Sequence, residues 1–399
     1  MNNLNFLVDV LKESPVFKTL EKNVKPGRTV CASGLSTINK SNIIYALCRL
    51  KGVTAFCLAS DEKEAQTLCN DLSCMGLRAY VYPVRDFNFL DFQSRSHEYE
   101  HARLKVLLKL LNHECDVAIA CVDAAAQLTV PRNVLEQSVI EFEEGRELSL
   151  EKATKALTLL GYERFDAVEG SGQFSLRGGI LDFFMPDSDY PVRCEFWGDE
   201  ITDLSYFDIE TQRRFKKADK ITLSPSTEIV IEDRAALADK IEHKAKLLRS
   251  KNSAKAKEKL FSEAELIRSG AMIANADKFI NQIYDKPESL FDYLDRNTLV
   301  FASEFTAIQE RGKSMDFISN ETLMQGFEDG TLCRGFDRFA LTFNECTEFL
   351  QSHGTIVLEN FVHGSMPIKL SEIISFSTKQ LSAWGGSYKQ LKEDVDGLF

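Results

Sequence analysis

Apolar and polar residues alternate with a period of two along residues 172–207, which is the pattern of β-strands that bury one face. Three turn sequences interrupt the alternation, at Gly178-Gly179, Asp187-Ser188-Asp189 and Gly198-Asp199. We therefore predict an antiparallel meander of three or four strands. The apolar phase of the alternation is assigned to the core, and its members are Phe174, Leu176, Val192, Cys194 and Phe196.

The opposite phase of the meander carries the candidate binding residues Arg177, Arg193 and Trp197, together with Glu195. Flat aromatic area and forked guanidinium donors bind well when a partner protein removes them from water, so this composition is typical of a protein-binding hot spot. A tryptophan in such a place is as often covered by the next element of its own chain. Alternation alone leaves both interpretations of Trp197 open.

Short apolar runs alternate with helical patterns outside the meander, which predicts a mostly parallel sheet of the helicase-lobe (RecA-like) kind. The runs are residues 28–32, 53–59, 78–82, 116–122, 298–301, 339–343 and 355–359, with helices at 1–25, 61–75 and 99–112. The last three runs return to the first sheet, so the predicted α/β fold is one lobe split by an inserted α+β domain. The predicted divisions are 1–123 and 221–365 for the lobe, 124–220 for the insertion, and 366–399 for a linker or the start of a third domain.

A loop between the first predicted strand and the helix that follows resembles a phosphate-binding loop. Gly34, Lys40 and Ser41 fit the pattern G-x-x-x-x-G-K-[ST], but Asn39 replaces the second glycine. A side chain there obstructs the close approach of phosphate to the backbone, although asparagine tolerates left-handed φ. Ser303 also stands at the end of the strand where a magnesium-binding carboxylate is expected. We expect a vestigial loop, and the alternative is an ATP-binding lobe that uses Lys40 and Ser41.

The segment His97-Glu98-Tyr99-Glu100-His101 satisfies the zinc-peptidase pattern H-E-x-x-H. A third metal ligand is required, and the extension x-x-G-x-x-H is absent because residues 102–108 read ARLKVLL. We therefore expect an ordinary helix start and no metal site, with a zinc hydrolase as the remote alternative.

Charge and composition narrow the class of protein further. The net charge of −12 over 399 residues argues against a nucleic-acid binder along the whole chain. The exception is the Lys-rich stretch 244–259, which is either a nucleic-acid contact or a solvated turn of a helical hairpin over residues 231–270. There is no basic leader followed by an apolar run and no stretch of 18 apolar residues, so we expect a cytoplasmic protein. None of the ten cysteines forms a C-x-x-C pair, and we expect them to be reduced and buried.

Three stretches of the meander carry a family resemblance, namely GQFSLRGGILDFF (172–184), PVRCEFWGDEI (191–201) and SYFDIETQR (205–213). They resemble the second domain of the bacterial transcription-repair-coupling factors (Mfd), and the matching domain of the excision-repair protein UvrB. The split lobe is also similar to the first domain of that family, which its second domain interrupts. The final stretch, FSTKQLSAWGGSYKQLKEDVDGLF, looks like the opening of the family's third domain.

The resemblance implies a role in recruitment. In this family the second domain docks onto UvrA, through two arginines and an aromatic residue that correspond to Arg177, Arg193 and Trp197. The full-length family members are ATP-dependent DNA translocases that release RNA polymerase stalled at a lesion, with ATP and Mg²⁺ held in motor lobes that are missing here. The resemblance therefore implies an N-terminal fragment that binds UvrA, has no catalytic residues and needs no cofactor. RNA polymerase and double-stranded DNA would be partners of the missing domains.

Overall fold

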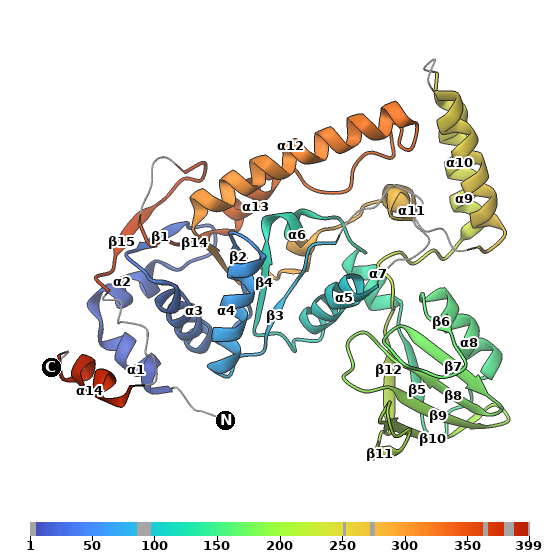
Figure 1. Cartoon of the computed structure of the whole chain (residues 1–399), viewed down its shortest axis with the longest axis horizontal. Coiled ribbons are helices and arrows are strands. Elements are labelled where there is room, and N and C mark those ends of the chain that lie inside the picture. Colours follow the sequence, from blue (N-terminus) through green and yellow to red (C-terminus); the bar gives the residue numbers. More distant parts are fainter. Residues whose placement is uncertain are drawn as a thin grey trace.

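The computed structural model describes residues 5–85, 97–249, 253–271, 276–361, 366–378 and 387–397. These residues form one sheet of seven strands, one of six strands and one of two strands (Figure 1). The predicted fold class is confirmed, because a parallel sheet forms a RecA-like lobe and a separate, largely antiparallel sheet is inserted into it.

The lobe is built on parallel strands in the order β15-β1-β14-β13-β2-β4-β3. Their bounds are β1 Val30–Ser33, β2 Ala55–Ala59, β3 Ala79–Val81, β4 Val117–Cys121, β13 Leu299–Ser303, β14 Thr355–Leu358 and β15 Glu372–Ser375. The central strands are buried on both sides, which is why the sequence shows continuous apolar runs here instead of alternation.

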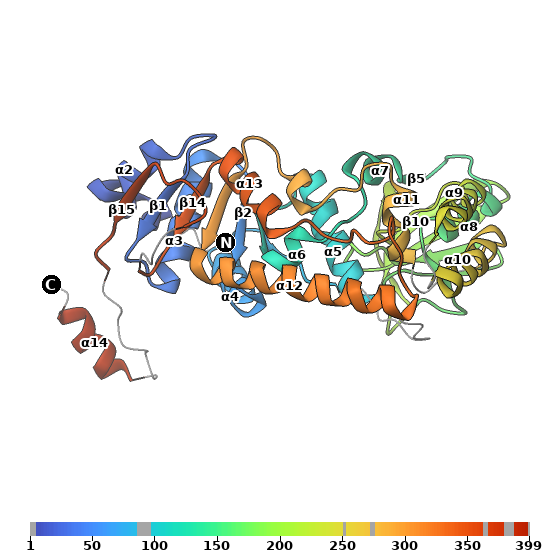
Figure 2. The same ribbon diagram turned by 90° about the horizontal axis from the view of Figure 1, so that it is seen from above.

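Helices cover both faces of the parallel sheet. One face is covered by α1 Asn5–Glu13, α2 Pro15–Asn23, α3 Thr37–Lys51 and α4 Glu62–Cys74. The other face is covered by α5 Glu98–Leu111, α6 Val122–Ala126, α13 Phe343–His353 and the beginning of α12 Phe305–Asp329. The 25-residue helix α12 continues beyond the sheet along the long axis of the molecule (Figure 2).

Three details of the lobe differ from the prediction. Residues 1–25 were predicted as one helix, but Ser14 caps a new helix that begins at Pro15. Residues 339–343 form no strand, because Ala340 makes only an isolated bridge and α13 begins at Phe343. Strand β15, at the edge of the sheet next to β1, was not predicted. Only two of its four residues, Ile373 and Ile374, are apolar, which is too short a run to indicate a buried strand.

The inserted unit contains the predicted meander. Its sheet has the order β11-β10-β9-β8-β7-β6, and its neighbours are antiparallel except for the pair β6–β7. The bounds are β6 Glu163–Arg164, β7 Gln173–Arg177, β8 Ile180–Phe183, β9 Val192–Trp197, β10 Glu200–Phe207 and β11 Arg214–Lys217. Helix α8 Leu150–Leu159 and the two-stranded sheet of β5 Ile140–Glu143 and β12 Lys220–Leu223 close its core.

A hairpin of α9 Arg234–Leu247 and α10 Ser253–Arg268 stands beside the lobe, as the sequence predicts (Figure 1). Its turn, residues 250–252, lies outside the described residues. The remaining elements are α7 Arg132–Gln137, α11 Ile280–Ile283, α14 Tyr388–Asp396 and two 3-10 helices, Ala276–Phe279 and Leu290–Tyr293.

The sheet of the lobe extends past two of the predicted divisions. Residues 124–130 and Leu135 pack in the core of the lobe and not in that of the inserted unit, whose first strand begins at Ile140. Strand β15 at residues 372–375 pairs with β1, so part of the segment 366–399 belongs to the lobe. The first shift arises because residues 124–130 are buried and carry no polar linker signal, and the second because the partner strand of β15 lies more than 330 residues earlier in the chain.

Across the described ranges, no helix is long and apolar enough to cross a membrane. All ten cysteines are unpaired, and all of them except Cys74 are buried.

Candidate functional site

The outer face of the inserted sheet carries the three predicted binding residues. Phe174, Val192, Cys194 and Phe196 point into the core and are buried, and Leu176 is partly buried. The side chains between them therefore point away from the core. Cross-strand registry places Arg177 opposite Ile180, and Ile180 opposite Glu195, so these residues of three strands lie on one face.

Trp197 is the most exposed large side chain of this face, with 82% of its surface accessible. It is the last residue of β9, and Gly198, with a φ of 63°, turns the chain into β10 immediately after it. The next element of the chain therefore leaves the indole open, and the interpretation in which Trp197 is covered by its own neighbours is wrong for this structure. An exposed indole of this kind gains from a partner that removes it from water.

Both predicted arginines bind one carboxylate, that of Asp182 on β8. Arg193 donates to it from Nε at 2.7 Å and from a terminal nitrogen at 2.8 Å, and Arg177 donates to it at 3.0 Å. The Asp182 side chain is only 1% exposed, so its charge is compensated entirely by this fork. The hydrogen bonds that Arg193 donates to Asp182 raise the pKa of Arg193 above its ordinary value.

The two arginines are not equivalent. Arg193 is 13% exposed, donates further hydrogen bonds to the backbone and side chain of Gln212, and lies over the Phe207 ring at 4.4 Å. Arg177 is 52% exposed and makes a single bond to Asp182. Arg177 and Trp197 therefore have open surface on this face, whereas Arg193 is largely buried among Asp182, Gln212 and Phe207.

Asp182, Gln212 and Phe207 position the two arginines, and none of the three is predicted from the sequence. Asp182 could have been found as the acidic residue on the strand next to Arg193, but the pairing of the two residues depends on the registry of the strands. Arg214 adds a second set of ion pairs on the same face, with Glu195 and Asp203.

The loop that resembles a phosphate-binding loop is filled by its own chain. Helix α3 begins at Thr37, so only residues 34–36 form the loop, and the backbone N–H groups of Gly34 and Leu35 donate to the carbonyls of Asn360 and Glu359. A Cβ atom on Gly34 would lie 2.1 Å from the Phe376 carbonyl oxygen. The backbone that would surround a phosphate is therefore already bonded and covered.

Lys40 and Ser41 are also engaged within the protein. Lys40 is 4% exposed, and its Nζ lies 2.5 Å from Glu304 Oε1, 3.0 Å from Ser303 Oγ and 3.5 Å from Glu64 Oε1. Ser41 Oγ donates to Asp71 at 2.9 Å. Ser303 lies at the end of β13, as predicted, but the carboxylates that meet Lys40 come from Glu64 and Glu304. The geometry is that of a structural ion cluster at the carboxyl edge of the sheet.

Glu359 adds a titratable carboxyl to this edge. Its Oε1 accepts from the Phe305 backbone N–H at 2.8 Å, while its buried Oε2 has no partner within the described residues. Burial and the nearby Glu304 raise the pKa of Glu359 to about 7. Its folded-state pKa thus lies above its unfolded value of about 4.5, and the neutral form is favoured in the folded protein.

The free energy of unfolding should therefore fall as the pH rises through 7. Below the unfolded pKa both states hold the proton and the stabilisation is complete, whereas at pH 8 the charged Glu359 costs on the order of 2 kcal/mol. Urea unfolding at pH 5 and pH 8 measures this loss, and Glu359→Gln should reduce the difference between the two values. Glu372→Gln, an exposed partner of Arg28, should leave the profile unchanged. A Glu359→Gln profile parallel to that of the wild type would rule out this assignment.

The H-E-x-x-H segment lies at the junction between the lobe and the inserted unit. His97 Nδ1 lies 2.9 Å from Glu100 Oε2, and the rings of His97 and His101 stack with centroids 5.9 Å apart. Glu100 is buried, but the hydrogen bond from His97 and the charge of Arg85 outweigh burial and lower its pKa to about 2. Within the part of the chain that the structure describes, no group of three or more metal-ligating side chains comes together.

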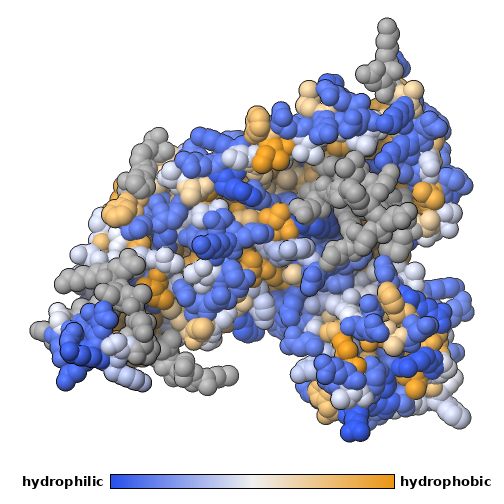
Figure 3. Space-filling model, in the orientation of Figure 1, coloured by the Kyte–Doolittle hydropathy of each residue, from blue (hydrophilic) through white to orange (hydrophobic). Residues whose placement is uncertain are grey.

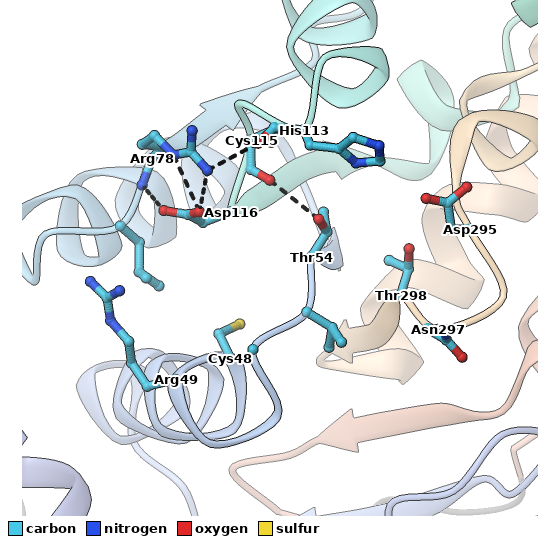
Figure 4. A pocket seen from close by; sticks show the side chains of 13 residues that line it. Cys48, Arg49, Thr54, Arg78, His113, Cys115, Asp116, Asp295, Asn297 and Thr298 are labelled. Atoms are coloured by element: carbon cyan, nitrogen blue, oxygen red, sulfur yellow. Dashed lines mark hydrogen bonds and ion pairs between the residues drawn. The ribbon is translucent and has the colours of Figure 1, made fainter.

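A hollow of about 460 Å³ opens at the opposite, amino-terminal edge of the parallel sheet (Figure 4). Its charged groups are paired with the protein itself. The Arg78 guanidinium makes two hydrogen bonds to Asp116, Arg49 donates to the Gly76 carbonyl, and Asp295 is paired with Arg132. These pairs satisfy the cations, so the hollow offers little to a charged ligand.

Comparison with known proteins places the exposed face in a recognised domain. Residues 140–229 match a family model described as the UvrB interaction domain. The chain is 26% identical to the transcription-repair-coupling factor of Bacillus subtilis (strain 168) over an alignment that covers 97% of this chain and 34% of that protein. The corresponding protein of Staphylococcus epidermidis (strain ATCC 12228 / FDA PCI 1200) is 25% identical over 79% of this chain. That of Staphylococcus aureus (strain MRSA252) is 22% identical over 98% of this chain and 34% of its own length. This chain is similar to the N-terminal third of the transcription-repair-coupling factors.

The similarity confirms the resemblance inferred from the sequence. The chain spans about a third of the length of the first of these relatives, and 27% of the Staphylococcus epidermidis protein. The matched domain, residues 140–229, contains β5 to β12 and so includes Arg177, Arg193 and Trp197. The transcription-repair-coupling factors are therefore similar to this chain in both the lobe and the inserted unit.

Proposed function

We propose that this chain recruits UvrA to RNA polymerase stalled at DNA lesions, as the N-terminal part of a transcription-repair-coupling factor. The observation that carries the proposal is the open indole of Trp197 beside the half-exposed Arg177, within the segment that matches the UvrB interaction domain. In this proposal UvrA covers the indole and meets the free side of the Arg177 guanidinium. Polymerase release and ATP-driven movement along double-stranded DNA belong to parts of the longer protein outside this chain.

Removal of the indole should weaken UvrA binding the most. Trp197→Ala should reduce the free energy of UvrA binding by about 2 kcal/mol, which raises the dissociation constant about thirtyfold. Arg177→Ala should reduce it by about 1 kcal/mol, because the Arg177 guanidinium is half-exposed and water weakens its contacts. Isothermal titration calorimetry with purified UvrA measures both losses.

Phe317→Ala and Arg338→Ala are the matched controls, because they remove an exposed aromatic and an exposed arginine from the lobe. Both should bind UvrA as the wild type does. Failure of the wild-type chain to bind UvrA, or unchanged binding by Trp197→Ala, would refute the proposed function.

The proposal assigns no catalytic residue and no cofactor to this chain. It is supported by the engagement of Lys40 with Glu64 and Glu304, and by the cover that Phe376 and Thr378 form over Gly34. Equilibrium dialysis with labelled ATP and Mg²⁺ should detect no binding tighter than about 1 mM. Tighter binding that is lost in Lys40→Ala would favour the alternative of an ATP-binding lobe.

A further inference from the structure

The helical hairpin α9–α10 separates its charges along its length. Residues 244–259 contain seven lysines and arginines and one carboxylate, Glu258, in a chain whose net charge is −12. At the other end of the hairpin the cations are neutralised: Arg268 bonds Asp239, Glu242 and Glu265, and Lys278 bonds the buried Glu263. The turn half of the hairpin therefore carries an excess of positive charge.

Four cations near the turn have no carboxylate partner in the described structure. These are Arg249, Lys255 and Lys257 of the hairpin, and Arg334 in the segment after α12; all are at least partly exposed. Surface cations gain little from isolated pairing, but four of one sign create a field that attracts a polyanion. The hydrophilic surface of this region is visible at the upper right of Figure 3.

A hollow of about 670 Å³ lies between the end of α9, the turn side of α10 and the end of α12. Arg249, Arg334 and Lys244 line it, and so do the apolar side chains of Leu247, Leu248 and Phe327. Leu247 is 58% exposed although it is next to the basic residues. No carboxylate is among the described residues that line this hollow.

We propose that this hollow docks an acidic segment of a partner protein whose apolar side chains enter between α9 and α12. Charge complementarity identifies the occupant as an anion, and the apolar floor distinguishes a peptide from a nucleic acid. The phosphate backbone of a nucleic acid would pair with the cations but would gain nothing from the leucines. Bases stack on exposed aromatic rings, and Phe327, the one aromatic residue among the described residues of the lining, is partly buried. An amphipathic acidic helix supplies both kinds of contact, since its leucines fill the floor while its glutamates meet the rim.

The test uses the whole chain and three fluorescein-labelled synthetic 16-residue helices in an anisotropy titration. The first carries Glu with Leu at i, i+3 and i+4 spacing, the second replaces Glu by Gln, and the third replaces Leu by Ser. The first should bind with a dissociation constant below about 100 µM, and the other two at least about tenfold more weakly. A labelled 20-base-pair DNA duplex is the fourth probe and should bind more weakly than the first peptide.

Two variants test the location of the site. The double variant Arg249→Glu/Arg334→Glu should weaken binding of the first peptide at least about tenfold, and Leu247→Ser about fivefold. Lys63→Glu/Lys389→Glu makes the same charge change on α4 and α14 and should bind as the wild type does. Circular dichroism melts confirm that each variant is folded. Equal losses in the two double variants, no binding of the first peptide, or tighter binding of the duplex would overturn the proposal.

Discussion

Arg103→Met should lower the free energy of unfolding by about 3–5 kcal/mol, because it leaves a buried carboxylate without its main counter-charge. The Arg103 side chain is fully buried and donates to Glu228 at 2.6 and 3.3 Å and to Gln127 at 2.7 Å. Its guanidinium also lies over the Tyr82 ring at 4.2 Å. Glu228, equally buried, keeps only Thr129 at 2.7 Å and the more distant Arg85 at 3.8 Å once Arg103 is removed.

This network holds the inserted unit against the lobe. Arg103 belongs to α5 of the lobe, whereas Glu228 lies in the segment that leaves the inserted unit after β12. Glu100, one turn before Arg103, accepts from the Glu228 backbone N–H at 2.8 Å. Loss of Arg103 should therefore also increase amide hydrogen exchange in residues 224–231.

Urea unfolding measures the effect of Arg103→Met, with Arg78→Met as its matched control. The Arg78 guanidinium also donates two hydrogen bonds to a carboxylate, that of Asp116, but its side chain is 51% exposed, so its loss should cost less than about 1 kcal/mol. The double variant Arg103→Met/Glu228→Gln should recover part of the loss, since no buried charge then remains unpaired. Equal losses for Arg103→Met and Arg78→Met would show that burial does not govern the strength of these pairs.

Six of the seven strands of the lobe could be predicted from the sequence to within two residues at each end, although the strand predicted at 339–343 does not form. Buried parallel strands are continuous apolar runs in the sequence. This holds for Ala55–Ala59 and Val117–Cys121, which contain no charged residue. Strand β15 could not be predicted in the same way, because an edge strand is half-exposed and Glu372 interrupts its pattern. Its pairing with β1, more than 330 residues earlier in the chain, leaves no local trace.

The candidate site shows the same division between local and distant information. The period of two along β9 predicts that Trp197 points away from the core, and this needs only the sequence of one strand. That no other part of the described chain covers the indole is known only from the structure. Whether the loop at Gly34 is open to a phosphate depends on Phe376 and Thr378, which pack against it from more than 340 residues later in the chain. A sequence motif shows only which residues follow one another in the chain. Whether such a loop can bind a ligand depends on the residues that pack against it in the fold.

Asp182→Asn should cost about 3 kcal/mol in stability, and it should weaken UvrA binding up to about fivefold, as the loss of Arg177 does, without Asp182 itself meeting a partner. The carboxylate is 1% exposed and holds Arg177 and Arg193 by three hydrogen bonds. Asparagine has nearly the shape of aspartate, but it has a single oxygen and no negative charge. The guanidiniums of Arg177 and Arg193, on the two strands beside β8, therefore lose the anion between them. Arg177 then loses its fixed position on the outer face, and binding must order it again.

Asp203→Asn is the matched control, since Asp203 pairs with Arg214 on the same face but its side chain is 25% exposed. It should cost less than about 1 kcal/mol and should leave UvrA affinity within about threefold of the wild type. Thermal unfolding and calorimetry with UvrA, performed on both variants, separate a loss of fold from a loss of binding surface. If Asp182→Asn is destabilised but binds UvrA as tightly as Asp203→Asn does, then Trp197 alone carries the recognition and the position of Arg177 does not matter.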